Sequence, residues 1–159
     1  MKENLYSTSI RTYSGRYVDV FHPVPEMFCI DDIAWSLSNQ CRFAGHTKIF
    51  YSVAEHCIDC YSRNRSLEAL MHDASEAYLV DIPRPIKNQI HDYQKIEHNL
   101  NTVLSAVFGF KYPFSKSVKK ADEIALKWEW ENVVLRKNRK EKNKVAVYRL
   151  YKSLIINEL

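Results

Sequence analysis

Residues 69–76 read Ala-Leu-Met-His-Asp-Ala-Ser-Glu, which places a histidine and an aspartate side by side inside an apolar, helix-like pattern. Burying two ionisable groups costs several kcal/mol unless they are paired or bound to a metal. An imidazole nitrogen and a carboxylate oxygen are both common metal ligands. The doublet His72-Asp73 therefore suggests a buried metal site.

Apolar residues recur at helical spacing around this doublet and predict a helix over about 66–79. The segment Asp81–Pro85 contains two prolines, which cannot continue a helix, so the helix ends before it. A helix that begins at Ile30 is also expected, with Asp31 or Asp32 as its cap. The same periodicity predicts helices over about residues 51–62, 86–108, 117–136 and 145–157.

Residues 8–21 have a different pattern. Ser14-Gly15 stands between Ile10 and the alternating run Tyr17–Phe21, which predicts a small β-hairpin. The whole chain has only 3 glycines and 5 prolines in 159 residues, which favours long helices over a sheet with many turns. The sequence thus predicts one all-α domain over residues 1–159, a helical bundle with a small N-terminal β-hairpin.

Composition is that of an ordinary globular protein, and the net charge of +4 permits an anionic substrate without requiring a nucleic-acid partner. No stretch approaches the roughly 20 apolar residues of a membrane span. The first residues resemble no signal peptide, so we expect a cytoplasmic protein with reduced thiols and no membrane partner. Cys57 and Cys60 form a C-x-x-C, but a structural zinc site would need a second such pair. We therefore interpret them as two small apolar helix residues.

The run Arg136–Lys144 is strongly basic. Its simplest interpretation is a solvated connection. The alternative is a nucleic-acid-binding module, whose affinity would fall steeply with salt. That alternative gives no reason for the His72-Asp73 doublet, so no nucleic-acid partner is expected.

Further candidate ligands lie at workable distances along the chain. His56 stands at the margin of the apolar stripe of one helix, and Asp122 stands in a later helical stretch, where the helix macrodipole would also favour an anion. Two nitrogens and two oxygens suit a borderline divalent ion such as zinc, iron, manganese or cobalt. Each has a simpler alternative, because a lone histidine at a helix edge or an aspartate at a helix start needs no metal.

These residues and their surroundings resemble the HD-domain phosphohydrolases. The blocks that carry the resemblance follow the family's order: RFAGHT at 42–47, YSVAEH at 51–56, HDASEAY at 72–78 and DIPRPIK at 81–87. The resemblance covers about residues 15–135. It implies a catalytic divalent metal (zinc, cobalt or manganese, with magnesium as an additional ion) held by His56, His72, Asp73 and Asp122.

Two activities within that superfamily fit the resemblance. One is the short phage-type dATP triphosphohydrolase, which converts dATP and water to deoxyadenosine and triphosphate and so depletes a nucleotide pool. The other is the bacterial 5′-deoxynucleotidase, which releases phosphate from deoxynucleoside monophosphates. The hairpin, the block at 42–47 and the short chain favour the first, with dATP as the expected substrate. Family members are commonly homo-oligomers, so a dimer or hexamer is expected.

The resemblance also implies the remaining roles. Glu76, one helical turn after His72, would transfer a proton for the attacking water or the leaving 5′-oxygen, and Asp81 would orient that machinery or hold a second ion. A purine would need a flat apolar slot, and we expect Ile33 and Trp35 to help line it, although Trp35 packed in the core is the alternative. The residues expected to contact phosphate or sugar are Arg42, His46, Arg84 and Lys87.

Overall fold

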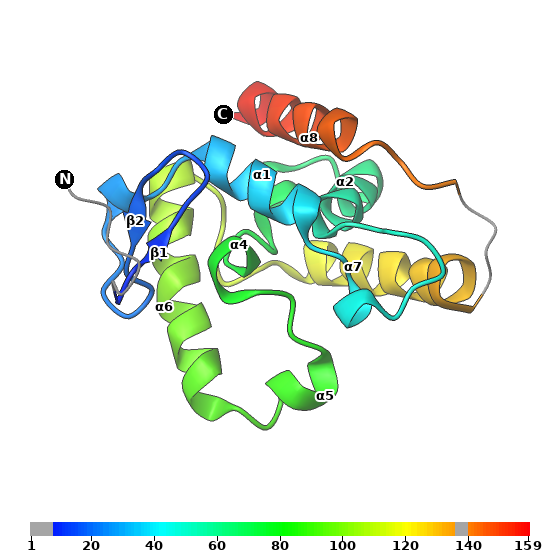
Figure 1. Cartoon of the computed structure of the whole chain (residues 1–159), viewed down its shortest axis with the longest axis horizontal. Coiled ribbons are helices and arrows are strands. Elements are labelled where there is room, and N and C mark those ends of the chain that lie inside the picture. The colour runs from blue at the N-terminus through cyan, green and yellow to red at the C-terminus, as the bar shows by residue number, and fades with distance from the viewer. Residues whose placement is uncertain (1–7, 136–139) are drawn as a thin grey trace.

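The computed structural model describes residues 8–135 and 140–159. These residues form a bundle of helices with a two-stranded hairpin beside it (Figure 1), so the predicted all-α fold with a small N-terminal hairpin is confirmed. In the described part of the chain, no helix combines the length and the apolar character that crossing a membrane requires. Of the basic run Arg136–Lys144, residues 136–139 lie outside the described residues.

The strands β1 (Ile10–Arg11) and β2 (Tyr17–Val18) are antiparallel, with Ile10 opposite Val18. Two short 3₁₀ turns cover Pro25–Met27 and Phe43–Gly45, and a π-helical segment, Trp130–Leu135, continues α7. The helices are α1 (Ile30–Asn39), α2 (Val53–Arg63), α3 (Leu67–Met71), α4 (Glu76–Leu79), α5 (Arg84–Lys87), α6 (His91–Phe108), α7 (Lys116–Glu129) and α8 (Lys144–Glu158).

The core lies where α1, α2, α3 and α8 meet. Leu37 of α1, Leu70 of α3 and Ile155 of α8 are fully buried in it, and burying a side chain of this size contributes roughly 1.5–3 kcal/mol. The Tyr151 hydroxyl of α8 donates to the Leu70 carbonyl oxygen at 2.5 Å. Figure 1 shows α8 lying along α1 at the edge of the bundle. The last helix therefore holds α3, and with it the segment that carries the doublet.

The predicted helix over 66–79 is interrupted at the doublet. α3 ends at Met71, and α4 begins only at Glu76. Between them, the amides of Ala74 and Glu76 donate to carbonyl oxygens three residues earlier, those of Met71 and Asp73. This tighter winding is typical of 3₁₀ turns, which often mark functional segments. His72 and Asp73 thus stand in a tight turn between two short helices.

Two capping predictions differ from the structure at α1. The residue before α1 is Cys29, and no side chain caps this helix. Asp32 instead accepts hydrogen bonds from the amide and hydroxyl of Ser14, at 2.6 and 2.8 Å, and so ties the hairpin to α1. Asp31 accepts from the hydroxyl of Tyr148 at 2.7 Å. Both carboxylates serve tertiary contacts, which a local sequence pattern does not reveal.

The later helices follow the predicted ranges with shifted ends. The predicted helix over 86–108 divides into α5 and α6, and α8 matches its predicted range to within one residue at each end. α7 begins at Lys116, after a Ser115 hydroxyl that accepts from the amide of Val118. Asp122 therefore lies in the second turn of α7, and its placement owes little to the helix macrodipole.

Candidate metal centre

His56 lies near the start of α2, which is fixed by side-chain hydrogen bonds. Ser52 and Glu55 form a capping box: the Ser52 hydroxyl accepts from the Glu55 amide, and the Glu55 carboxylate accepts from the Ser52 amide. His56 follows in the first turn of α2 and is fully buried. The cap therefore fixes where α2 starts and which face of it carries the imidazole.

Four potential ligand atoms converge at the meeting point of α2, α7 and the turn after α3. The Nε2 atoms of His56 and His72 lie 3.2 Å apart. Oδ1 of Asp122 lies 3.2 Å from the His56 Nε2 atom. Oδ2 of Asp73 lies 3.6 Å from His56 Nε2 and 3.4 Å from His72 Nε2. The four residues that the sequence predicts as metal ligands are thus brought together.

These spacings fit a bound ion. With metal–nitrogen and metal–oxygen bonds of about 2.0–2.1 Å in a tetrahedron, neighbouring ligand atoms stand roughly 3.3 Å apart. The measured separations between donor atoms lie on either side of that value, from 3.2 to 3.6 Å. These four separations are therefore compatible with donors around one divalent ion.

The outer nitrogens of both rings favour the same conclusion. Nδ1 of His56 lies 2.7 Å from Oε1 of Glu129, and Nδ1 of His72 lies 2.8 Å from the Ala69 carbonyl oxygen. Both partners accept hydrogen bonds, so each Nδ1 carries the proton and each neutral ring presents the lone pair of its Nε2 inward. Two imidazole lone pairs and two carboxylate oxygens then face one another, and only a cation or added protons can relieve that crowding.

The pKa values of these groups follow from the same crowding. Burial lowers the pKa of His72, but the Asp73 carboxylate and Cys60 outweigh it and bring the pKa to about 9. Burial and Arg42 lower the pKa of His56, whereas Glu129 and Asp122 raise it well above its usual value. Burial raises the pKa of Asp122, but its contact with His56 holds the net value far below the ordinary range. The cluster attracts positive charge.

A sulfur atom also lies at the centre. Sγ of Cys60 stands 3.5 Å from Nε2 of His56, and both Cys57 and Cys60 are buried. His56, Cys60, His72 and Asp122 each offer an atom within 4.8 Å of the others. Sequence reasoning treated Cys60 as an apolar packing residue; its four-residue spacing from His56 was the available signal.

Glu129, at the end of α7, is a second buried residue of the centre that the sequence did not predict. It is 0% exposed, and its two carboxylate oxygens accept from Nδ1 of His56 at 2.7 Å and from Nε of Arg42 at 3.2 Å. A carboxylate that holds the outer nitrogen of a ligand histidine fixes the ring and increases its basicity. Glu129 follows Asp122 by two helical turns and so shares its face of α7, but that spacing alone does not distinguish it from other helical glutamates.

A cavity of about 440 Å³, here called the Arg42 cavity, is lined in part by the candidate metal ligands Asp73 and Asp122. The remaining charged residues of its lining are Arg42, Glu76, Asp81, Arg84 and Lys87. The Arg42 guanidinium also lies 3.6 Å from Asp73 and 3.8 Å from Asp81. Arg42 is therefore surrounded by three carboxylates, counting Glu129, which hold its pKa above the usual value despite burial.

Glu76 lines the Arg42 cavity and has one uncommitted oxygen. It is 5% exposed, its Oε1 lies 3.5 Å from Nζ of Lys87, and its Oε2 is buried without a hydrogen-bond partner. Burial and the nearby charges of Asp73 and Asp81 raise the pKa of Glu76 well above its usual value. A buried carboxyl group whose pKa is raised in this way suits proton transfer.

Backbone strain gathers at the edges of this cavity. The non-glycine residues with positive φ in the described ranges are Phe43 (56°), Ala44 (51°) and Val80 (69°). Phe43 follows Arg42, and Val80 precedes Asp81. Such conformations cost of order 1–3 kcal/mol each and concentrate at functional sites. At this turn the ring centroid of Phe43 lies 6.5 Å from that of the half-exposed Trp130, and both residues line the cavity.

Some predicted substrate contacts lie elsewhere. Ile33 is fully buried in the core, and Trp35 stacks on Tyr13 at 4.4 Å beside the hairpin. Neither residue lines the Arg42 cavity, whereas Trp35 lines a separate cavity of about 330 Å³ beside the hairpin, so their place in a base pocket stays a prediction. His46 is exposed and is not among the residues that line that cavity. Arg84 and Lys87 do line it, on the prolyl segment that follows α4.

Comparison with known proteins gives relatives without a recorded activity. No family model matches the chain. The uncharacterized protein YfdR of Escherichia coli (strain K12) is 43% identical over 123 residues, which cover 76% of this chain and 69% of YfdR. The uncharacterized protein RCAP_rcc00048 of Rhodobacter capsulatus is 31% identical over 140 residues, 77% of this chain and 71% of that protein. At this identity and coverage, the chain belongs to the same protein family as YfdR and RCAP_rcc00048.

Proposed function

We propose that the protein is a metal-dependent phosphohydrolase of the HD-domain type that acts on deoxynucleotides, with dATP triphosphohydrolase as the preferred assignment. The observation that carries the proposal is the convergence of two imidazole Nε2 atoms and two carboxylate oxygens at the edge of a cavity that also holds cations. Nitrogen and oxygen donors in this ratio suit zinc, cobalt or manganese. His56, His72, Asp73 and Asp122 would hold the ion.

When bound, the ion would polarise the phosphate nearest the sugar and lower the pKa of a water molecule. The chain's own residues would do the rest. Glu76, which lines the Arg42 cavity, would accept or donate a proton at its buried and uncommitted Oε2. Asp81 would keep Arg42 directed along the cavity wall, since it lies 3.8 Å from the guanidinium.

The aromatic pair Phe43 and Trp130 supports a nucleotide over a simple phosphate ester. Both rings line the Arg42 cavity, and Trp130 is 51% exposed, so its face is accessible to a planar base. Stacking of a base on an aromatic side chain contributes roughly 1–3 kcal/mol. Arg84, 65% exposed at the same cavity, would contact a phosphate oxygen.

The 5′-deoxynucleotidase activity is the second candidate. Charges in the Arg42 cavity favour it, because Arg42 is surrounded by three carboxylates and Lys87 pairs with Glu76 and Glu97. Such a balanced cavity suits a single phosphate group. Both reactions break a bond at the phosphorus nearest the sugar, so the same metal ligands would serve either.

Product analysis tests the proposal. The metal-loaded protein is incubated with every deoxynucleoside monophosphate and triphosphate, and the products are identified. Tripolyphosphate and a deoxynucleoside indicate the preferred activity, and inorganic phosphate from a monophosphate indicates the second. Asp73→Ala serves as the inactive control. A metal-saturated wild-type protein that releases neither product contradicts the proposal.

A further inference from the structure

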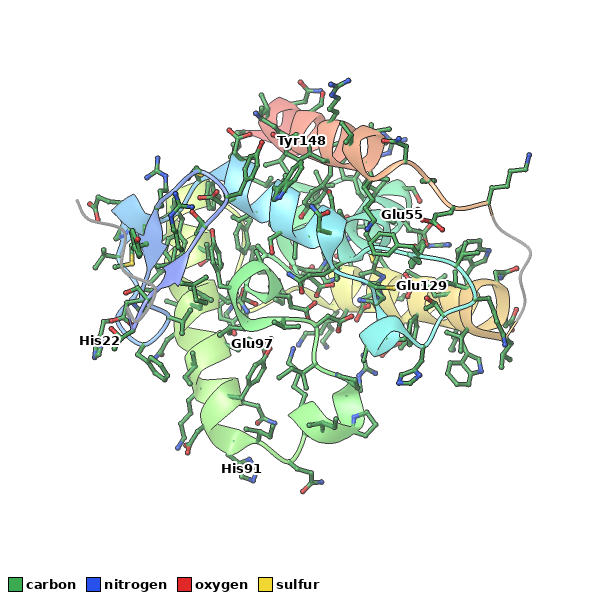
Figure 2. The ribbon with its side chains drawn as sticks, viewed as in Figure 1. His22, Glu55, His91, Glu97, Glu129 and Tyr148 are labelled. Atoms are coloured by element: carbon green, nitrogen blue, oxygen red, sulfur yellow. The ribbon has the colours of Figure 1, made fainter. Side chains whose placement is uncertain are left out.

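A second cavity reaches the same metal ligands from another direction. It has a volume of about 340 Å³ and is lined by His72, Asp73 and Asp122. We call it the Asn101 cavity, after a buried residue in its wall. Its other polar wall residues are Lys87, Glu97, Asn101, Tyr112 and Lys119. Glu97 extends from α6 toward the middle of the molecule (Figure 2), where it pairs with Lys87.

Asn101 has an unmet hydrogen-bonding capacity at this cavity. The residue is only 4% exposed, and its Oδ1 atom is buried without a partner. Buried amides in folded proteins are almost always hydrogen-bonded, because an unpaired one is costly. Rotation of the amide by half a turn presents either its oxygen or its NH₂ group to the cavity. Asn101 therefore points to a bound group that completes its hydrogen bonds.

Lys119 supplies an uncommitted positive charge. It is an exposed residue of α7, and no ion pair joins it to a carboxylate within residues 8–135 or 140–159. Lys87, the other cation of this wall, is already paired with Glu76 and Glu97. Lys119 precedes the metal ligand Asp122 by three residues, so the two side chains share a face of α7, less than one 5.4 Å turn apart. A free cation thus lies next to the metal centre.

The aromatic residues of this wall are engaged with each other. Tyr112 and Phe114 meet edge to face at 5.0 Å, and Phe114 also stacks with Phe110 at 6.3 Å. The Tyr112 hydroxyl lies 3.0 Å from Nδ1 of His98. A base that stacked on these rings would have to replace their existing contacts. Trp130 of the Arg42 cavity is half-exposed and offers a more accessible ring. The wall is better suited to an anion than to a base.

We propose that the Asn101 cavity binds the phosphates of a nucleoside triphosphate that lie beyond the one at the metal, with Lys119 and the NH₂ group of the rotated Asn101 amide as the donors to their oxygens. The inference rests on the proposed function, because it assumes that the metal centre holds the first phosphate. The two cavities then divide the substrate: the nucleoside lies against Phe43 and Trp130, and the distal phosphates lie against α6 and α7. Lys119 becomes the residue that selects for the length of the phosphate chain.

Anion binding tests this directly, without turnover. Inorganic tripolyphosphate and orthophosphate are titrated calorimetrically into the metal-loaded protein, its Lys119→Ala and Lys119→Arg variants, and the control Lys120→Ala. Lys120 is exposed on the same helix and does not line the cavity. Lys119→Ala should weaken tripolyphosphate binding roughly tenfold, the loss typical of one charge-assisted hydrogen bond, and change orthophosphate binding less than about twofold. Lys119→Arg and Lys120→Ala should bind like wild type.

Asn101→Ala gives an independent check, because it removes an unpaired group and should leave the melting temperature nearly unchanged while weakening tripolyphosphate binding. Equal losses for both anions in Lys119→Ala, or no loss for either, would overturn the inference even if the protein hydrolyses nucleotides. Conversely, a Lys119-dependent preference for tripolyphosphate in a protein that hydrolyses no nucleotide supports the anion cavity and contradicts the proposed function.

Discussion

The two sides of the metal centre are built differently. On the side of α2 and α7, His56, Arg42 and Glu129 are almost fully buried and bonded to one another. On the other side, the segment from His72 to Lys87 begins with tight turns at 72–76, carries a strained residue at Val80, and leaves one oxygen of Glu76 without a partner. The first side fixes the position of a ligand ring. The second offers groups that can still bind or exchange a proton.

The largest expected effect comes from removing a ligand that both sides share. Asp73→Ala takes away the oxygen that lies 3.6 and 3.4 Å from the two imidazole nitrogens. We expect bound metal to fall below one tenth of the wild-type content and hydrolysis to fall by about a thousandfold or more. Metal analysis and a phosphate-release assay measure the two effects.

Asp59→Ala is the matched control, because Asp59 is an aspartate of α2 that pairs only with Arg63 at the surface in the described contacts. It should retain full metal and activity. A folded Asp73→Ala protein with a full complement of metal and undiminished turnover would exclude the proposed centre.

Glu76→Gln should separate the two sides. The substitution keeps the shape of the side chain but removes its ability to exchange a proton, and general acid–base groups typically contribute about 10²–10⁴-fold in rate. We expect a loss of about that size in kcat, with metal content unchanged, because Glu76 makes no contact with the ligand atoms among the described interactions. Rapid-quench kinetics together with metal analysis measure both quantities. An equal loss of metal would show that Glu76 is a ligand rather than a proton carrier.

The sequence predicted which candidate ligands come together better than it predicted the residues that hold them in place. The doublet His72-Asp73, with His56 and Asp122, could be found because ionisable groups stand out in an apolar helical pattern. Glu129 could not be singled out, because in the run Trp128–Glu131 it looks like any helical glutamate. Its role depends on α7 crossing α2, and a one-dimensional pattern contains no crossing angle. The same holds for Asp31 and Asp32, whose partners lie at the opposite end of the chain or in the hairpin.

Helix existence was predictable, and helix continuity at the site was not. Apolar periodicity placed all the long helices, but it extended one of them through residues 72–75, where the backbone tightens. Apolar periodicity shows which side of a helix is buried. Over a single turn, a 3₁₀-helix and an α-helix bury similar positions, so periodicity does not distinguish them. Position in the chain was also a poor guide to which cavity a residue lines: Ile33 and Trp35 precede Arg42, but α1 directs them to the core and to the hairpin.

Glu129→Gln tests the buried side of the comparison. A glutamine can still accept from Nδ1 of His56, but it removes the charge that faces His56 and Arg42. Changes in the group that holds a ligand histidine typically weaken metal binding about 10–100-fold. We expect a loss of affinity in that range, with kcat nearly restored at saturating metal. Competition against a chromogenic chelator measures it.

Glu123→Gln is the control for that experiment, since Glu123 is exposed on the same helix one residue beyond Asp122. It should bind metal like wild type. If Glu129→Gln binds metal as tightly as Glu123→Gln, the buried carboxylate does not support the histidine. The conclusion that the buried side fixes the His56 ring for metal binding would then be wrong.

The smallest effect is expected at Arg84, an exposed residue of the segment from His72 to Lys87. Arg84 is 65% exposed and lies 3.9 Å from Asp122, so its charge is well screened and it contributes little to folding. Arg84→Ala should raise KM for the nucleotide about threefold, with kcat and the melting temperature unchanged, because an exposed cation adds only a fraction of a kcal/mol to phosphate binding. Steady-state kinetics at two salt concentrations measure this, and the difference from wild type should shrink at the higher salt. Arg63→Ala, at an exposed ion pair on α2, should show neither change. A large fall in kcat for Arg84→Ala would instead place the guanidinium at the reacting phosphate, and the open side would then take part in the chemistry as well as in binding.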